Sequence, residues 1–152
     1  MNVSEKVALR LLSNLDPEKA HNLAMKALKF GFIPKTQGFH AKSLELSVAG
    51  LKFKNPLGLA AGFDKNAEAI KPLLKFGFGF IEVGAVTPLA QNGNPKPRLF
   101  RLKEDNAIIN RFGFNNDGMH EVSKRLSKRP SNGIVGLNLG ANKNSVDRIS
   151  EF

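Results

Sequence analysis

Three apolar runs in the sequence each end in small residues followed by polar donors. The run 56–61 leads into Gly62 and then into Asp64 and Lys65, which place an acid beside a base. The residues at and just beyond the ends of the three runs are Ala60, Ala61 and Gly62; Gly84, Ala85, Val86 and Thr87; and Asn138, Gly140, Asn142 and Lys143. Small residues let a planar ring approach the backbone, while amides and an ammonium group can donate hydrogen bonds to it or to an anion. This pattern predicts an electron-rich heterocycle and an anionic substrate as ligands.

A second dense polar stretch is NRFGFNN, residues 110–116. Its asparagine amides can pair with the edges of a pyrimidine-like ring, and Gly113 can form a tight turn that exposes them. The same residues also suit a turn followed by a helix, because Asn116 and Asp117 are both good helix caps. Both interpretations remain open from these residues alone.

Each feature taken singly also has a structural explanation. Residues 60–62 could serve tight strand packing, Asn138 could cap a loop, and Lys65 could be solvated. The three histidines are His21, His40 and His120. They lack metal-ligand spacing and have no carboxylate cluster beside them, so core or surface roles are expected for them and no metal site is predicted.

Predicted strands and helices alternate along the chain, and they must position the small and polar residues described above. Largely apolar runs predict buried strands at 56–61, 79–86 and 134–139, and helical patterns predict helices at 66–76 and 117–128. Strands that alternate with helices indicate right-handed crossovers and a parallel sheet. In such a sheet, ligand groups gather beyond the carboxyl ends of the strands, where the small and polar residues lie. The fold class is therefore α/β, although three strands are too few to close a barrel.

Two hairpins are predicted beside this sheet. Leu44, Leu46 and Val48 alternate with polar residues, Ala49-Gly50 turns, and 51–53 alternates again. The second hairpin pairs 98–102 with 107–110 around a polar turn at Lys103 to Asn106.

Two amphipathic helices open the chain. Ser4 is a candidate cap for the first, and Asp16-Pro17 begins the second, with Gly31 as its stop. The apolar stripes are Val7, Ala8, Leu11, Leu12 and Leu15 in the first helix, and Ala20, Leu23, Ala24, Ala27 and Leu28 in the second. Lys19, Lys26 and Lys29 lie off the second stripe, as in an interfacial helix that presents cations to lipid head groups. Packing onto a core with solvated lysines is the alternative.

The amino-acid composition limits the classes of fold and function that the chain can have. The 152 residues carry 41% hydrophobic and 24% charged residues and no cysteine, which fits a globular domain without disulfides, a thiol nucleophile or a thiolate metal site. The net charge of +10 indicates attraction to anions. The basic residues are scattered, and Trp and Tyr are absent, so the stacking surface of a typical single-strand nucleic-acid binder is not evident. No secretory or membrane-spanning run is expected.

Five motifs together resemble a known family. NPLGLAAGFDKN, IEVGAVTP, GNPKPRLFRL, INRFGFNN and GLNLGANKN, in this order and spacing, are similar to the N-terminal part of class 2 dihydroorotate dehydrogenases, the membrane-associated, quinone-reducing FMN enzymes of pyrimidine biosynthesis. The resemblance implies a partial (β/α)8 TIM barrel, containing its first three strands, after a two-helix extension. It divides the chain into a membrane-docking and quinone-tunnel region, 1–36, and part of an FMN-binding barrel, 37–152. The soluble class 1 enzymes are disfavoured by the N-terminal helices and by the RLFRL insertion.

The resemblance also implies roles for individual residues. Those matching the FMN-contacting positions are Ala60, Ala61, Gly62, Phe63, Asp64, Ala85 and Asn138. Those matching the dihydroorotate-binding positions are Lys65, Asn110, Arg111, Phe112, Gly113 and Phe114. Arg101 matches the arginine at the inner end of the quinone tunnel, and the two helices match the pair that docks on an anionic membrane surface, on the cytoplasmic face of the inner membrane in a bacterium.

Some positions depart from the family pattern. Ala85 stands where Thr or Ser commonly contacts FMN, Ala141 stands where lysine is common, and Leu12 stands where some relatives have Gln in the quinone tunnel. A (β/α)8 barrel takes about 250 residues, so the chain is expected to be a partial enzyme, inactive alone, whose serine base lies beyond Phe152. The rival hypothesis is a non-enzymatic basic remnant that binds lipid or nucleic acid.

Overall fold

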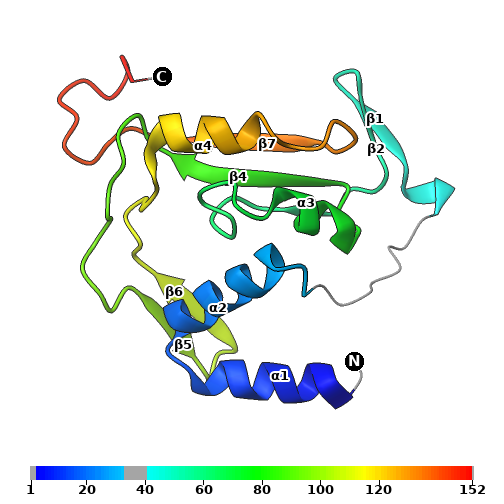
Figure 1. Ribbon diagram of the computed structural model, residues 1–152, viewed down its shortest axis with the longest axis horizontal. Helices are drawn as coiled ribbons and strands as arrows, with labels where there is room; N and C mark the ends of the chain where they lie inside the picture. Colours follow the sequence, from blue (N-terminus) through cyan, green and yellow to red (C-terminus); the bar gives the residue numbers. More distant parts are fainter. Residues whose placement is uncertain (1–2, 33–40, 152) are drawn as a thin grey trace.

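The computed structural model describes residues 3–32 and 41–151, and side chains from residue 6 onward. Along the chain lie α1 (Val3–Asn14), α2 (Pro17–Lys29), η1 (Lys42–Leu44), β1 (Leu46–Val48), β2 (Leu51–Phe53), β3 (Gly58–Leu59), α3 (Ile70–Leu73), η2 (Leu74–Phe76), β4 (Phe80–Val86), β5 (Leu99–Leu102), β6 (Ala107–Asn110), α4 (Gly118–Leu126) and β7 (Val135–Leu139). Helices α1 and α2 lie at one side of the molecule and the longest strands at the other (Figure 1).

The predicted parallel sheet is present. Its order is β3-β4-β7, with Gly58 opposite Phe80 and Val83 opposite Leu137. Strand β4 is central, and five of its seven residues are buried, as its largely apolar sequence indicates. Strand β3 is confined to two residues, because the chain leaves the sheet soon after Leu59 to form the loop that contains Gly62.

The core lies between this sheet and the helices. Ile81 and Val83 of β4 are fully buried and belong to one cluster with Ile70 and Leu73 of α3. The other buried members are Met25, Leu28, Ala67, Ala69, Val86 and Val122. Because Met25 and Leu28 come from α2, this helix shares the core of the sheet.

Strand β7 differs from the expectation of a strand buried on both faces. Leu137 and Leu139 are 44% and 53% exposed. In the part of the chain that the structure describes, β7 pairs only with β4, and β3 likewise pairs only with β4. The sheet therefore has two open edges and an uncovered apolar surface, which is unusual for a parallel sheet.

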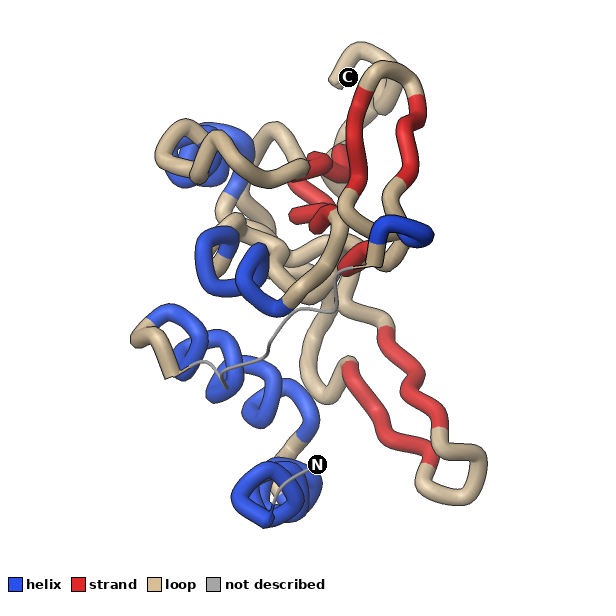
Figure 2. The backbone as a smooth tube through the Cα atoms, turned by 90° about the vertical axis from the view of Figure 1, so that its right-hand side faces the viewer, coloured by secondary structure: helices blue, strands red, loops and turns tan. Residues whose placement is uncertain are grey.

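Both predicted hairpins are confirmed. Strands β1 and β2 pair around Ala49 and Gly50, which adopt the positive φ values of 49° and 78° that a tight hairpin turn requires. Strands β5 and β6 pair from Leu99 opposite Asn110 to Leu102 opposite Ala107. Figure 2 shows the two hairpins projecting from opposite ends of the molecule.

The helices differ in detail from the expectations. Helix α1 already includes Val3, so Ser4 is not its cap. The region 66–76 is helical only from Ile70, because the preceding residues form a loop held by Asp64. Asp16 does cap α2, accepting a hydrogen bond from the Lys19 amide at 3.0 Å. The expected boundary near residue 36 lies outside the described residues, as does His40.

Candidate functional site

Ten predicted site residues line one cleft of about 570 Å³. The cleft lies where β3, β4 and β7 end, and the loop after β6 closes one side of it. Its lining residues are Ala61, Gly62, Lys65, Gly84, Ala85, Asn94, Asn110, Arg111, Phe112, Gly113, Phe114 and Asn138. Segments as far apart in sequence as Gly62 and Asn138 thus face one space, as expected for the carboxyl ends of parallel strands.

Gly62 presents bare backbone to this cleft. Its φ of 104° suits glycine, and a Cβ placed there would meet no atom within 4 Å. The Gly62 amide donates to the Gly84 carbonyl at 2.8 Å, and the Gly84 amide donates to the Asp64 carbonyl at 3.2 Å. These bonds hold the loop after β3 against the end of β4.

Asp64 supports this loop from behind. Its carboxylate accepts hydrogen bonds from the backbone amides of Glu68 and Ala69, both at 2.8 Å, and the residue is only 1% exposed. Burial raises the pKa of Asp64, and the two amides oppose that rise. The Asp64 side chain is absent from the described cleft lining, so its observed role is to fix the loop.

Lys65 reaches into the cleft. Its ammonium donates to the Gly62 carbonyl at 2.7 Å and lies 4.2 Å from the centre of the Phe112 ring, a cation–π contact. Burial lowers the pKa of Lys65, the charge of Glu18 opposes this, and the charge of Arg98 adds to it. An anion in the cleft would stabilise the charged lysine.

Gln91 and Asn94, to which the sequence analysis assigned no role, hold the substrate-loop candidates in place. The Asn94 amide side chain donates to the Arg111 carbonyl at 2.8 Å, and its backbone amide donates to the Phe112 carbonyl at 2.9 Å. Gln91 donates to the carbonyl groups of Gly113 and Phe114 at 3.3 and 3.1 Å. Asn94 itself lines the cleft. Asn94 is the second residue of the GNPKPRLFRL motif, and that position is the sequence feature from which a role in the site could have been predicted.

Arg111 lines the cleft but is partly engaged elsewhere. Its guanidinium donates to the Pro97 carbonyl from Nε and Nη2 at 3.3 and 3.1 Å. Asn138 donates from Nδ2 to Glu82 Oε1 at 2.9 Å. That bond fixes which way the Asn138 amide points, because its nitrogen faces Glu82.

Other polar residues at the strand ends have structural partners. Thr87 is fully buried and donates to the Leu89 carbonyl at 2.6 Å. Asn116 and Asn142 donate to the Thr87 hydroxyl at 2.8 and 3.2 Å. Asn116 also accepts from the Gly118 amide at 2.8 Å, a turn just before α4, whereas the N-cap position of α4 is Asp117, whose side chain makes no capping hydrogen bond. These residues form a network that joins the loops.

Three residues matched to FMN-contacting positions do not line the cleft among the described contacts, and Arg101 is expected at the quinone tunnel, outside this cleft. Phe63 and Asp64 line a neighbouring cavity of about 310 Å³ against α2, and Ala60 lines neither space. Arg101 lies at the C-terminal end of α1, where its guanidinium donates to the carbonyl groups of Leu12, Ser13 and Leu15 at 3.2, 3.0 and 2.7 Å. The positive charge of Arg101 is favourable there, because the C-terminal end of a helix such as α1 carries a partial negative charge.

The cleft can bind and orient a ligand more readily than it can move a proton. Its described lining supplies amides, backbone groups, a lysine and an arginine, but no carboxylate, histidine or hydroxyl. The parallel sheet, the helices between its strands and the cleft at the strand ends place the chain in the α/β class, in which ligands bind beyond the carboxyl ends of the strands.

Comparison with known proteins gives the family. Residues 43–152 match the family model for dihydroorotate dehydrogenase, so the chain belongs to that family. The dihydroorotate dehydrogenase (quinone) of Cereibacter sphaeroides strain KD131 is 55% identical over 153 residues, covering 100% of this chain and 43% of the relative. That of Agrobacterium fabrum is 58% identical over 138 residues, covering 91% and 38%.

A solved structure gives the same result. The dihydroorotate dehydrogenase of Eimeria tenella, crystallised with ferulenol, superposes with a TM-score of 0.85 at 43% identity and covers 95% of this chain and 42% of that one. The chain thus spans about 40% of the length of these relatives. The expected partial (β/α)8 barrel, with its parallel sheet and N-terminal helices, is confirmed.

Proposed function

We propose that this chain forms the amino-terminal part of a quinone-reducing dihydroorotate dehydrogenase and supplies one wall of its flavin and substrate site. The reaction would oxidise dihydroorotate to orotate in pyrimidine biosynthesis and pass the electrons to a membrane quinone. The observation that carries the proposal is the convergence of Gly62, Lys65, Asn110 and Asn138 on one cleft. The names of the relatives support the substrate and the acceptor.

The residues present fit FMN, the cofactor of the family. The cleft volume of about 570 Å³ falls in the usual range of small-molecule sites. Ala61, Gly62 and Ala85 would let a flat ring lie against the backbone, since Gly62 borders open space. Asn138 would meet the ring edge, and Ala85 can offer only backbone contact. When bound, FMN supplies the hydride acceptor.

Lys65 would bind the substrate carboxylate. An ammonium group has three donors, and the Gly62 carbonyl takes one of them. The Phe112 ring holds the ammonium from one side. Asn110 and Asn94 would orient the substrate ring, which places the reacting carbon near the flavin.

Proton removal is assigned to a group outside the described lining, because that lining has no carboxylate, histidine or hydroxyl and its one lysine is assigned to the substrate carboxylate. The family resemblance implies a serine for this role. We therefore assign binding and orientation, rather than turnover, to the residues of this chain.

The N-terminal helices would contact the membrane. Among the described residues, no helix is long and apolar enough to cross a bilayer. Instead, apolar side chains on α1 and α2 face solvent: Val7 and Leu11 are 52% and 64% exposed, and Phe30, just after α2, is 80% exposed. Lys29 pairs with Glu68 at 2.7 Å, which leaves Lys19 and Lys26 as better candidates for lipid head groups.

Ligand binding to the 152-residue chain tests the proposal. We expect FMN to bind, measured by flavin fluorescence, and orotate to bind to the FMN-loaded chain. Lys65→Met should weaken orotate binding at least about tenfold, as expected when a charge-assisted hydrogen bond is lost, and should leave FMN binding nearly unchanged. The control Lys103→Met removes an exposed charge in the β5–β6 turn and should change neither affinity.

A dye-coupled assay of dihydroorotate oxidation supplies the second arm. We expect no turnover by the chain alone. Turnover comparable to that of a full-length relative would contradict the assignment of the base to another segment. Salt-sensitive DNA binding without any FMN binding would instead favour the basic remnant.

A further inference from the structure

A second pocket lies at the opposite end of the sheet from the candidate active site. It has a volume of about 480 Å³ and is bordered by Gly79 and Ile134, which immediately precede β4 and β7. The candidate active site borders the other ends of the same strands. The seven residues of β4 separate the two spaces by about 20 Å. The pocket is therefore independent of the flavin and substrate cleft.

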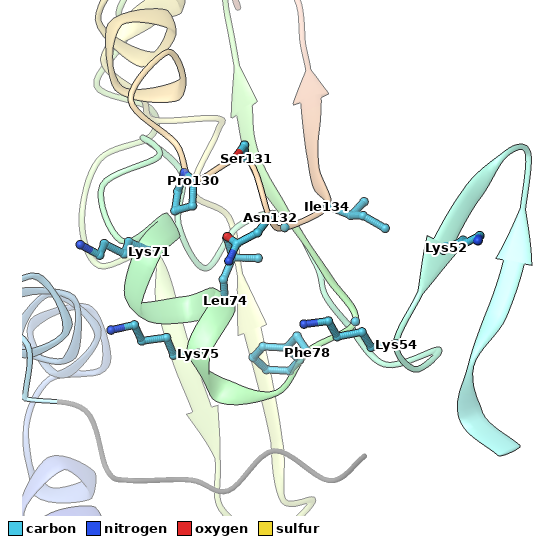
Figure 3. A pocket seen from close by; sticks show the side chains of 12 residues that line it. Lys52, Lys54, Lys71, Leu74, Lys75, Phe78, Pro130, Ser131, Asn132 and Ile134 are labelled. Atoms are coloured by element: carbon cyan, nitrogen blue, oxygen red, sulfur yellow. The ribbon is translucent and has the colours of Figure 1, made fainter. Parts of the chain in front are cut away.

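The lining of this pocket is cationic. It contains four lysines, Lys52, Lys54, Lys71 and Lys75, together with Ser131 and Asn132, and no carboxylate. None of these lysines is within ion-pair distance of an acidic group of the described chain. Figure 3 shows Lys71 and Lys75 on one side of the pocket and Lys54 on the other, with Phe78 and Asn132 between them, while Lys52 extends away along the hairpin.

Two of these exposed lysines repel each other weakly when no anion is present. Lys71 and Lys75 are four residues apart across α3 and η2, a spacing at which like charges repel. Lys54 lies directly after β2, which is paired with β1, so tertiary structure brings it near the lysines of α3 and η2. A phosphate group would relieve this repulsion and accept hydrogen bonds from the ammonium groups.

The pocket also has an apolar part. Leu74, Phe78 and Ile134 line it beside the lysines, and Phe78 is partly accessible. An aromatic ring offers a face on which a planar group can stack. Inorganic phosphate alone would leave this surface unused.

We propose that this pocket binds an organic polyphosphate from solution, such as a nucleoside triphosphate. Lys54, Lys71 and Lys75 hold the phosphates, Asn132 donates a further hydrogen bond, and the planar body lies against Phe78. The proposal does not depend on the function proposed for the cleft.

Calorimetric titration of the 152-residue chain with adenosine triphosphate, inorganic pyrophosphate and adenosine tests it. We expect adenosine triphosphate to bind more tightly than pyrophosphate, and adenosine not to bind measurably. The double variant Lys71→Gln/Lys75→Gln should weaken triphosphate binding about tenfold, from two lost ion pairs. Phe78→Leu should weaken triphosphate binding and leave pyrophosphate binding unchanged.

The control is Lys19→Gln/Lys103→Gln, which removes the same charge from exposed positions outside the pocket. Equal weakening by both double variants would show attraction to overall charge only and overturn the proposal. Circular dichroism checks that the variants fold, and Lys54→Gln, on the hairpin, is a second variant expected to weaken binding about threefold.

Two further experiments distinguish triphosphate binding in this pocket from binding in the cleft and from lipid binding. Lys65→Met, in the cleft, should leave triphosphate affinity unchanged, and a matching loss there would move the ligand to the cleft and overturn the proposal. Displacement of bound triphosphate by vesicles of phosphatidylcholine with phosphatidylglycerol would assign the pocket to lipid head groups and also overturn it.

Discussion

Glu18 and Arg98 form a buried, two-point ion pair between α2 and the start of β5. Arg98 Nη2 lies 2.7 Å from Glu18 Oε1, and Arg98 Nε lies 3.1 Å from Glu18 Oε2. The remaining arm of the guanidinium donates to the carbonyl groups of Asn92 and Asn94 at 2.6 and 3.1 Å. Because Asn94 holds the 110–114 loop, this pair links the N-terminal helices to one wall of the candidate site.

Replacing one partner should be costly. The side chains of Arg98 and Glu18 are only 8% and 11% exposed, so Glu18→Gln would leave a buried guanidinium uncompensated. We expect a loss of about 3 kcal/mol in the free energy of unfolding, measured by urea denaturation. The control Lys124→Gln breaks the exposed pair with Glu121 and should cost less than about 1 kcal/mol. A Glu18→Gln loss no larger than that of the control would contradict the structural role.

His21 should make stability sensitive to mild acid. It packs edge-on against Phe63 at 5.1 Å, and burial lowers the pKa of His21 below 6.5, with the charge of Lys65 adding to the effect. The unfolded chain then binds a proton more readily than the folded chain, so stability is present above pH 6.5 and falls as the pH drops from there through the folded pKa.

The measurement is urea denaturation at several pH values between 7.5 and 5. His21→Gln should flatten the decline in the free energy of unfolding, whereas His120→Gln, at an exposed position on α4, should leave the wild-type slope. An unchanged slope in His21→Gln would mean that other groups cause the pH dependence.

Much of the fold follows from local pattern, whereas the supporting contacts do not. The apolar runs predicted β4 and β7, and the Asp16-Pro17 signal predicted the start of α2, because both depend on short-range preferences. The Glu18–Arg98 pair joins residues 80 positions apart, and no local signal specifies such a partner. The same holds for Asn94 and the loop that it supports.

In the candidate site too, local sequence pattern predicts some features, and others depend on tertiary contacts. Small residues at the strand ends indicated where a ligand would lie, and ten of the predicted residues line one cleft. The side-chain directions of Asp64 and Arg101 could not be predicted, since each depends on backbone groups that tertiary packing brings near. The roles of the lining residues in binding FMN and dihydroorotate stay predictions.

Asp64→Asn should weaken the loop after β3. Both carboxylate oxygens accept backbone hydrogen bonds, and an amide would present an NH2 group to one of those donors. We expect a loss of about 2 kcal/mol for the unsatisfied buried donor, with weaker FMN binding because Gly62 lies in the same loop. Asp105→Asn, in the exposed β5–β6 turn, is the control and should change unfolding by less than about 0.5 kcal/mol. Equal stability of both variants would contradict the anchoring role.

Gly84→Ala should disturb the pairing of β4 with β7. A Cβ at Gly84 would lie 2.5 Å from the Asn138 carbonyl oxygen, and φ is 110°. At Gly140 the nearest atom, the Ala85 Cβ, would be 3.7 Å away, an ordinary contact. We expect Gly84→Ala to lower the free energy of unfolding by at least about 2 kcal/mol, and Gly140→Ala to change it by less than about 1 kcal/mol. Similar thermal unfolding curves for the two variants would refute the close approach.

The exposed apolar face of the N-terminal helices should govern binding to membranes. Leu11 and Phe30 are 64% and 80% exposed, and burying a side chain of this size in a bilayer interface is worth about 1.5–3 kcal/mol. Leu11→Glu/Phe30→Glu should therefore reduce binding to phosphatidylglycerol-containing vesicles by at least about tenfold in co-sedimentation. Val146→Glu/Ile149→Glu changes the charge equally at two residues that are 104% and 86% exposed near the other end of the chain. If both double variants lose binding alike, overall charge rather than this helical face attracts the chain to lipid.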